Sequence, residues 1–228
     1  MFRPTLVVLA VSLAACGLPK DPEGTLERVR GGVLRVGAVE NPPWASSRRR
    51  PVGIDVELVE RLAADLDADV RWRFADAEEL FRAVEVRALD LVVGGIVADD
   101  PWVPRIGASS RYAETHVVIA APAGMPVPAD IEGRRVAVPF GSETVALVEE
   151  HGGVPVPVED VTGAEGLVAI EEWALDDLAL QDTGIVLDTA HHVMAVAPGE
   201  NAFLRAVDTF LLGREALISR LVEEAGAA

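Results

Sequence analysis

The chain lacks a second cysteine: Cys16 is the only one among its 228 residues, so no disulfide can form within it. The fold must then rely on an apolar core, which the 50% hydrophobic residues can supply. Positive charge is also scarce, with 20 Lys and Arg against 37 Asp and Glu and a formal net charge of −17. So acidic a chain repels nucleic acid and anionic headgroups, which argues against polyphosphate partners and against membrane binding by charge.

Several catalytic and metal motifs are missing as well. The sequence has no glycine-rich phosphate loop, no nucleophile elbow and no zinc-ligand spacing. His191 and His192 are neighbours, and adjacent residues of a strand face opposite sides, while His116 and His151 lie far off in sequence. We therefore expect no metal site and no cofactor. Beyond the first fifteen residues, no apolar run is long and uncharged enough to cross a membrane.

The N-terminal segment has the features of a lipoprotein signal. Arg3 supplies a positive charge, an apolar stretch follows, and Cys16 closes the run L-A-A-C-G. This run resembles the bacterial lipobox, in which the cysteine is acylated and becomes the first residue. We expect residues 1–15 to be a signal peptide, Cys16 to carry a lipid anchor in the membrane, and residues 16–31 to be a tether. The alternative is a short apolar leader with a chance cysteine.

The remaining sequence predicts an α/β protein. In the first half, strands are expected at 33–37, 70–74 and 90–95, with helices at 54–66 and 80–84 between them. This β-α-β-α-β order implies a parallel sheet with right-handed crossovers. Asp55 is expected to cap the first of these helices.

The second half repeats this alternation. Strands are expected at 117–121, 135–138, 154–158, 178–182 and 193–197. Helices are expected at 167–173, 202–212 and 215–225, and a further helix is opened by 141–144 and ended by Gly152-Gly153. The proline-rich stretch 122–128 is interpreted as a link between two lobes.

Short motifs in this order resemble the family 3 extracytoplasmic solute-binding proteins. They are Leu34-Arg35-Val36-Gly37, Pro42-Pro43-Trp44, Gly53-Ile54-Asp55-Val56-Glu57-Leu58, Asp90-Leu91-Val92-Val93-Gly94-Gly95, Tyr112, Gly141-Ser142-Glu143-Thr144 and Asp177-Leu178-Ala179-Leu180-Gln181-Asp182. The resemblance implies a type II periplasmic binding protein-like fold with two lobes, each a mostly parallel sheet flanked by helices. Lobe 1 would comprise 32–118 plus 195–228 and a trimmed lobe 2 would comprise 119–194, with the chain crossing near 117–121 and 193–197.

The resemblance also implies a function. Hinge closure of the lobes would catch a small polar solute and deliver it to the permease subunits of an ABC importer. We expect an extracytoplasmic, lipid-anchored monomer on a bacterial membrane, without nucleic-acid partners and without catalytic activity. The triplet Arg48-Arg49-Arg50 is interpreted as a solvated turn, with a docking patch for the permease as the alternative.

Ligand-binding roles carry over to particular residues. Trp44 would form an aromatic wall, and Asp182, at the end of an apolar strand, would bind a ligand amine; Glu40 is a second partner for that amine. Ser142, at a helix start, would hold an anion, with Glu143 beside it. The structural alternatives are a core tryptophan, an exposed turn aspartate, a solvated Glu40 and a plain helix cap.

The family's carboxylate-binding arginine is missing. Its Thr-x-x-Arg element, which follows Gly94 and Gly95, has Asp99 and Trp102 in the corresponding positions. An aromatic, acidic cleft suits an amine or another cation. Three alternatives remain. One is an amino acid whose carboxylate is held by Arg105 or Arg111, and a second is a module that senses its ligand without transport. A third is a dehydratase-type enzyme that uses Glu143 or Asp182 as acid or base.

Overall fold

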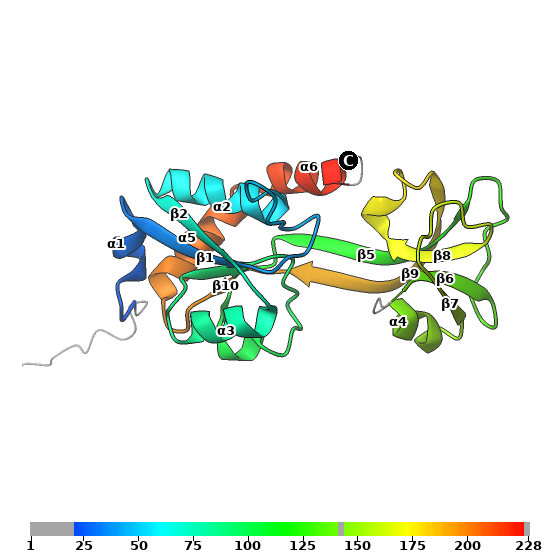
Figure 1. Cartoon of the computed structure of the whole chain (residues 1–228), viewed down its shortest axis with the longest axis horizontal. Coiled ribbons are helices and arrows are strands. Elements are labelled where there is room, and N and C mark those ends of the chain that lie inside the picture. The colour runs from blue at the N-terminus through cyan, green and yellow to red at the C-terminus, as the bar shows by residue number, and fades with distance from the viewer. Residues whose placement is uncertain (1–20, 141–143, 226–228) are drawn as a thin grey trace, which may run out of the picture.

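A computed structural model describes residues 21–140 and 144–225. The molecule is elongated, with two α/β lobes joined by the paired strands β5 and β9 (Figure 1). The first sheet has the order β2-β1-β3-β10-β4 and the second β7-β6-β8-β5-β9. The predicted two-lobed fold of the type II periplasmic binding proteins is confirmed. The prediction that each sheet is mostly parallel is wrong, because β10 and β4 in the first sheet and β5 and β9 in the second pair in antiparallel fashion.

The first lobe is built on a sheet whose N-terminal half is parallel. β1 pairs in parallel with β2 and β3, whereas β10 is antiparallel to β3 and β4. Its elements are α1 (Thr25–Val29), β1 (Val33–Ala38), α2 (Ile54–Asp65), β2 (Asp69–Phe74), α3 (Ala77–Glu85), β3 (Leu91–Val93), η1 (Val103–Arg105), β4 (Gly107–Ala108), β10 (Ala195–Val196), α5 (Asn201–Leu212) and α6 (Glu215–Ala225).

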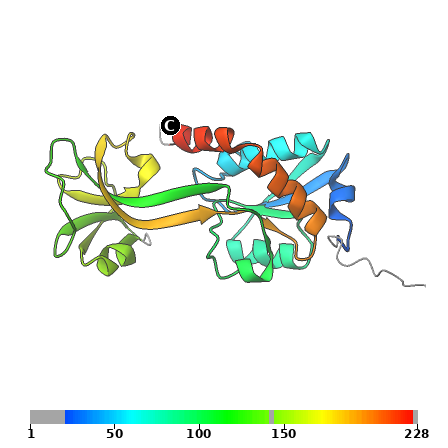
Figure 2. The ribbon, with the colours of Figure 1, turned by 180° about the vertical axis from the view of Figure 1, so that it is seen from behind.

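Two apolar layers cover this first sheet. Alternate residues of β1, beginning with Leu34 and Val36, pack against α2 and α5 on one face, because successive strand residues point to opposite sides. Phe81 of α3 and Val92 of β3 belong to the layer on the other face. In Figure 2, which shows the molecule from behind, α5 crosses in front of the first sheet, and α6 continues above β5 toward the second lobe.

The second lobe is smaller. β6 pairs in parallel with β7 and β8, and the long strands β5 and β9 complete the sheet in antiparallel pairing. Val138 and Val148 belong to the core between this sheet and its helix. The elements are β5 (Ala113–Pro122), β6 (Arg135–Pro139), α4 (Thr144–Glu150), β7 (Val154–Val158), β8 (Leu167–Glu171), η2 (Glu172–Ala174) and β9 (Leu180–His192).

The expected tether is wrong at its C-terminal end. Residues 25–29 form α1, which packs against α5, and Thr25 and Val29 are buried. Ordered structure therefore begins before residue 32, because the buried side chains of Thr25 and Val29 and hydrogen bonds to Glu200 hold this helix. Residues 16–20, with Cys16, lie outside the described residues.

The chain crosses between the lobes in the paired strands themselves. Residues 193–197, expected to make the second crossing, already lie in the first lobe, where Val193 and Ala195 are buried. The crossing belongs instead to the end of β9. The stretch 122–128 is not a link between lobes either, since it follows β5 within the second lobe, where Gln181 Nε2 donates to the Met125 carbonyl.

One element assignment in the second lobe is wrong and another is shifted. The expected helix at 167–173 is strand β8 followed by the short 3-10 turn η2. The expected strand at 178–182 begins two residues later, at Leu180, and continues as β9 to His192. The apolar run Leu167–Ile170 lies between two other strands and is buried on both faces, so it shows no alternation that would identify a strand.

Candidate functional site

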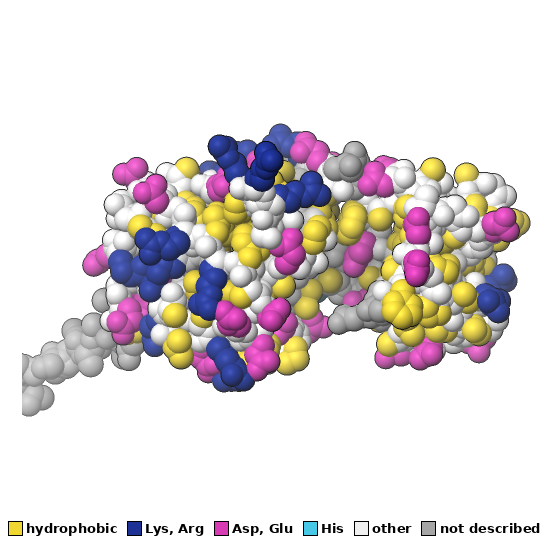
Figure 3. Space-filling model, viewed as in Figure 1, with side chains coloured by type: hydrophobic (Ala, Val, Ile, Leu, Met, Phe, Trp, Pro, Cys, Tyr) yellow, Lys and Arg dark blue, Asp and Glu magenta, His cyan; other side chains and the backbone are white. Residues whose placement is uncertain are grey.

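A cavity of about 680 Å³ lies between the lobes. It opens where several parallel strands end: Asn41 follows β1, Gly95 follows β3, and Glu171 is the last residue of β8. In open α/β sheets ligands bind beyond the carboxyl ends of the strands, because the loops there converge on one crevice. Figure 3 shows the recess between the two bodies, with acidic side chains in it.

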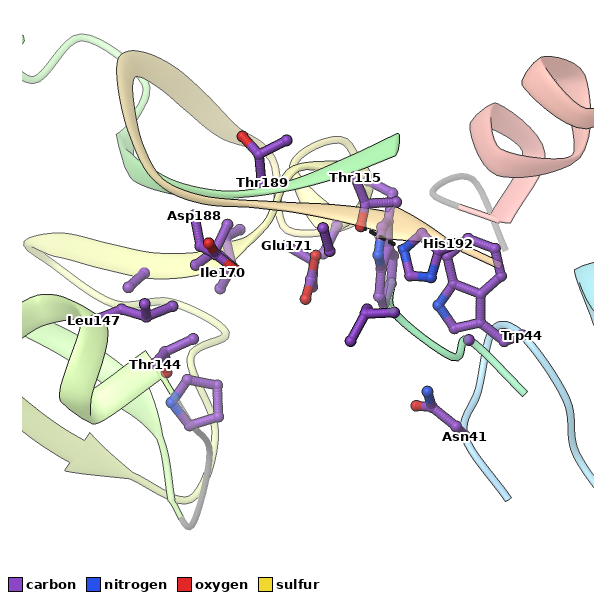
Figure 4. A pocket seen from close by; sticks show the side chains of 18 of the residues that line it. Asn41, Trp44, Thr115, Thr144, Leu147, Ile170, Glu171, Asp188, Thr189 and His192 are labelled. Carbon is purple, nitrogen blue, oxygen red and sulfur yellow. Dashed lines mark hydrogen bonds between the residues drawn. The ribbon is translucent and has the colours of Figure 1, made fainter. Parts of the chain in front are cut away.

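The first lobe contributes an aromatic wall. Trp44 is 5% exposed, and its ring lies 3.9 Å from the imidazole of His192, measured between centroids and with a tilt of 32°. Its indole therefore packs in the core of the first lobe and also lines the cavity. His192 Nε2 and Thr115 Oγ1 are hydrogen-bonded at 2.9 Å, as Figure 4 shows, so β5 and β9 are tied together at the cavity.

A buried carboxylate shapes the loop that faces Trp44. Asp55 Oδ2 accepts hydrogen bonds from the backbone N–H groups of Gly94 and Gly95 at 2.8 and 2.9 Å, and Oδ1 accepts one from the Tyr112 hydroxyl. Burial raises the pKa of Asp55, and these donors oppose the shift. Asp55 thus anchors the glycine loop. The prediction that it caps its own helix is wrong, because no side-chain hydrogen bond caps α2.

The negative charge of the cavity comes from the second lobe and the connecting strands. Glu171 and Asp188 both line the cavity, and Figure 4 shows the Glu171 side chain pointing into the space between the lobes. Burial, and after it the charge of Asp188, raise the pKa of Glu171 to about 7, whereas His116 opposes this. Asp99 adds a third carboxylate from the first lobe.

Positive charge is missing from the described lining. It contains neither lysine nor arginine, and burial lowers the pKa of His192 to about 4, so that its imidazole is neutral at physiological pH. Arg105, a proposed substitute for the family's arginine, pairs with Glu85 at 2.8 Å and lies over the ring of Trp102. Neither Arg105 nor Arg111 lines the cavity.

The structure brings together only some of the residues selected from the sequence. Trp44, Gly95 and Asp99 line the cavity, and Gly94 is held beside it by Asp55. Glu40 does not line the cavity: its carboxylate is exposed, and hydrogen bonds from Ser47 and Ser46 lower its pKa. Trp102 stacks on Phe81 at 5.8 Å, also away from the cavity. Ser142 and Glu143 lie outside the described residues.

Asp182 is not part of the cavity. It lies near the start of β9, where it pairs across the sheet with Ala120, and its Oδ1 accepts a hydrogen bond from the backbone N–H of Gly184. Asp182 is exposed, as the alternative named above expected, but it belongs to a strand and not to a turn. The strand that lies parallel to β6 and ends in an acidic residue at the cavity is β8, not the stretch 178–182. The acidic residue at its end is Glu171. An apolar run of four residues that ends in Glu was the available signal.

Other cavity residues were missed because they are far apart in sequence. They are Asn41, Thr115, Asp188, Thr189, Trp173 and His192. Long strands β5 and β9 carry most of them, and their pairing decides which side chains face the cavity. Within residues 21–140 and 144–225 there is no cluster of metal-ligating side chains and no helix long and apolar enough to cross a membrane.

Comparisons with known proteins agree with this architecture. Residues 34–216 match the family model of the bacterial extracellular solute-binding proteins, family 3. A search of curated proteins gives no match. The structure is similar to an ancestral cationic amino acid solute-binding protein, with 18% identity, a TM-score of 0.72, and coverage of 88% of this chain and 98% of that one.

Two further structures are similar. The L-cystine solute receptor of Neisseria gonorrhoeae, in its unliganded open conformation, has 18% identity and a TM-score of 0.71, with coverage of 89% and 96% of this chain and that one. A substrate-binding domain assigned to an amino acid ABC transporter of Streptococcus pneumoniae has 16% identity and a TM-score of 0.69, with coverage of 84% and 99%. At these identities the likeness establishes the fold.

Proposed function

The chain belongs to the bacterial extracellular solute-binding proteins of family 3, and from that premise we propose that it captures a small cationic solute for an ABC importer. The solute would bind in the cavity between the lobes and be enclosed when they close. The observation that carries the proposal is the charge of the described lining, which holds Glu171, Asp188 and Asp99 but no basic side chain.

The same charges favour an amine over an ordinary amino acid. A carboxylate in this cavity would face three acidic groups without a guanidinium, and a charge-assisted pair is among the strongest polar contacts available to a site. Trp44 and Trp173 supply aromatic surface, which attracts a cation by about 0.5 to 2 kcal/mol. One of the similar structures is described as a cationic amino acid solute-binding protein, and another as an L-cystine receptor. The first of these supports a cationic ligand for this chain.

Calorimetry with a small panel tests the proposal. Putrescine, choline and arginine are compared with glutamine and glutamate, and we expect cations to bind and glutamate not to. Glu171→Gln should weaken cation binding by about 10- to 100-fold, because a charge-assisted contact contributes about 1.5–3 kcal/mol. Asp182→Asn is the matched control, since Asp182 lies outside the cavity. Tighter binding of glutamate than of any cation would refute the cationic ligand.

Delivery to a permease is tested in cells. Deleting the gene should abolish uptake of the labelled cation, and the wild-type chain, but not Glu171→Gln, should restore it. Uptake that continues at the same rate without the protein would favour the sensing role over transport.

We also propose that the chain binds without converting its ligand. Among the acids that line the described cavity, Glu171 is the one with a raised pKa that would suit acid–base chemistry. The other titratable groups of this lining are carboxylates and the neutral His192, so no base with a matching pKa stands beside it. Incubation with cyclic hydroxy acids should therefore give no product. Turnover that Glu171→Gln abolishes would establish the dehydratase alternative instead.

Lipid attachment at Cys16 is part of the proposal. It rests on the run L-A-A-C-G after an apolar stretch. We expect labelled fatty acid to be incorporated into the wild-type chain and not into Cys16→Ser, which should leave the membrane fraction. Equal labelling of both chains would place the lipid elsewhere.

A further inference from the structure

Glu171 and Asp188 are two carboxylates that share one cavity without a counter-charge. Within the described part of the chain, neither side chain forms a hydrogen bond or an ion pair. Glu171 is partly buried at the end of β8, and Asp188 reaches the same space from β9. An unpaired carboxylate that is withdrawn from water is costly, and a second one nearby raises that cost.

The groups around Glu171 do not supply the missing positive charge. Some charged or titratable residues line this cavity or the pocket next to it, or pair with a residue that does. They are Asp188, His191 and His192 on β9, Glu114 and His116 on β5, Glu172 in η2, Glu223 on α6 and Asp99 across the cavity. His116 is the base whose charge lowers the pKa of Glu171, but its Nδ1 lies 2.7 Å from Glu172 Oε2 and its Nε2 lies 3.2 Å from Glu114 Oε1. These two acids already neutralise it.

The whole second lobe adds to this negative field. Between residues 119 and 194, Arg134 and Arg135 are the only lysine or arginine residues, and they lie at the start of β6, the end opposite the cavity. Figure 3 shows that basic side chains on the visible face lie mostly over the first lobe. Excess negative charge around a partly buried acid favours its protonated form, and the raised pKa of Glu171 agrees with this.

We propose that the unliganded cavity holds a proton on Glu171, beside Asp188, and that the incoming cation displaces it. The inference rests on the proposed function, because it concerns the same cavity and requires a cationic solute. The balance is simple: the free protein holds one carboxyl O–H at Glu171, the cation takes the place of that proton next to the carboxylate, and the proton passes to water.

The direction of the pH dependence follows. A cation beside Glu171 stabilises the carboxylate, so binding lowers its pKa from about 7. Below that pH the cation must expel a proton, and its affinity falls by up to tenfold for each pH unit. Above pH 8 the free protein is already ionised, and the affinity levels off.

Calorimetry in buffers of different ionisation enthalpy measures the released proton. Choline is the probe, since its quaternary ammonium does not titrate, and arginine is the second probe. We expect close to one proton released per bound cation at pH 6 and almost none at pH 9. Glu171→Gln should bind more weakly, with no proton release at either pH, whereas Asp182→Asn should behave as the wild type.

Binding with no proton release and with a pH-independent Kd would overturn the inference and leave the proposed function intact. Failure of both cations to bind at pH 9 would instead contradict the proposed function.

A second measurement needs no ligand. Carbon-13 NMR of carboxyl-labelled protein should show one glutamate signal, absent from Glu171→Gln, with a midpoint near 7. Asp188→Asn should move this midpoint to lower pH, because it removes the second carboxylate; an Asp182→Asn control should not. A Glu171 midpoint at the ordinary 4.5 would overturn the inference even if cations bind.

Discussion

Gly95 lies directly against the indole of Trp44. Its φ is +73°, and a Cβ at this position would be 2.5 Å from Trp44 Cδ1. Gly95→Ala should therefore displace Trp44 or the loop held by Asp55, lowering the free energy of unfolding by about 2 kcal/mol or more and weakening cation binding. Urea denaturation and calorimetry measure the two effects.

Gly124→Ala is the matched control for this prediction. Gly124 also has a positive φ, +85°, but nothing lies within 4 Å of its Cβ position, and it is far from the cavity lining. We expect only the backbone strain, about 1–2 kcal/mol, with an unchanged Kd. Equal losses of affinity in both variants would show that Trp44 is not the cause.

Glu171 should also make stability depend on pH. The unfolded chain ionises this residue near 4.5 and the folded chain near 7, so between these values the folded state binds more protons. Stability is therefore full below pH 4.5 and declines as the pH rises to 7. The wild type should lose stability relative to Glu171→Gln from pH 4.5 to pH 8 in urea denaturation. A constant difference between the two proteins would contradict this.

Among the elements, α1 shows how a helix of five residues is held in place. A helix this short is unstable alone, and no side chain of its own caps it. Glu200 directly precedes α5, and only 1% of its surface is exposed. Its carboxylate accepts hydrogen bonds from the backbone N–H groups of Glu23 and Thr25, both at 3.2 Å. Arg28 adds an ion pair with Asp90. The position of α1 therefore depends on residues more than sixty positions away.

Glu200→Ala should release α1. We expect faster amide hydrogen exchange across residues 23–29 and a loss of about 2 kcal/mol in unfolding free energy, because two backbone donors lose a charged acceptor. Glu224→Ala is the control, since Glu224 is exposed and pairs with Arg220 only at 3.6 Å. Its effect should stay below about 0.5 kcal/mol. Unchanged exchange in Glu200→Ala would mean that burial of Thr25 and Val29 suffices.

At the scale of the whole molecule, β5 and β9 form the connection between the lobes. Their pairing runs from Ala113↔His192 to Pro122↔Leu180, with irregularities between Val117 and Val118 and between Ile119 and Ala120. Outside this pair, α6 reaches η2, which directly follows Glu171 (Figure 2). A ligand that contacts both lobes across the cavity is expected to draw them together by a hinge in these strands.

Small-angle X-ray scattering tests that expectation. Saturating choline or arginine should reduce the radius of gyration of the wild type, and Glu171→Gln at the same concentration should show a smaller reduction, because its cavity is less occupied. Unchanged scattering at a concentration where calorimetry shows saturation would mean that the ligand binds without closure.

The sequence by itself determined the family, the two-lobed α/β fold and most elements of the first lobe. There the apolar periodicity is strong: α2 begins at Ile54 and β1 at Val33, as predicted. The sequence also indicated that the family's carboxylate-binding arginine is missing, because Asp99 and Trp102 occupy the positions of the Thr-x-x-Arg element that follows Gly95. These features depend on residues close together in the chain.

Only the tertiary structure decided which acids face the ligand. Asp182 and Glu171 each follow an apolar run, and nothing local distinguishes an exposed position on an edge strand from the end of a central strand. The pairing of β8 with β6 and β5 makes that distinction, and it brings Glu171 near Asp188 across β5. Strand pairing joins residues that are distant in sequence. The charge of the cavity, and with it the proton that we propose on Glu171, therefore depends on the folded chain.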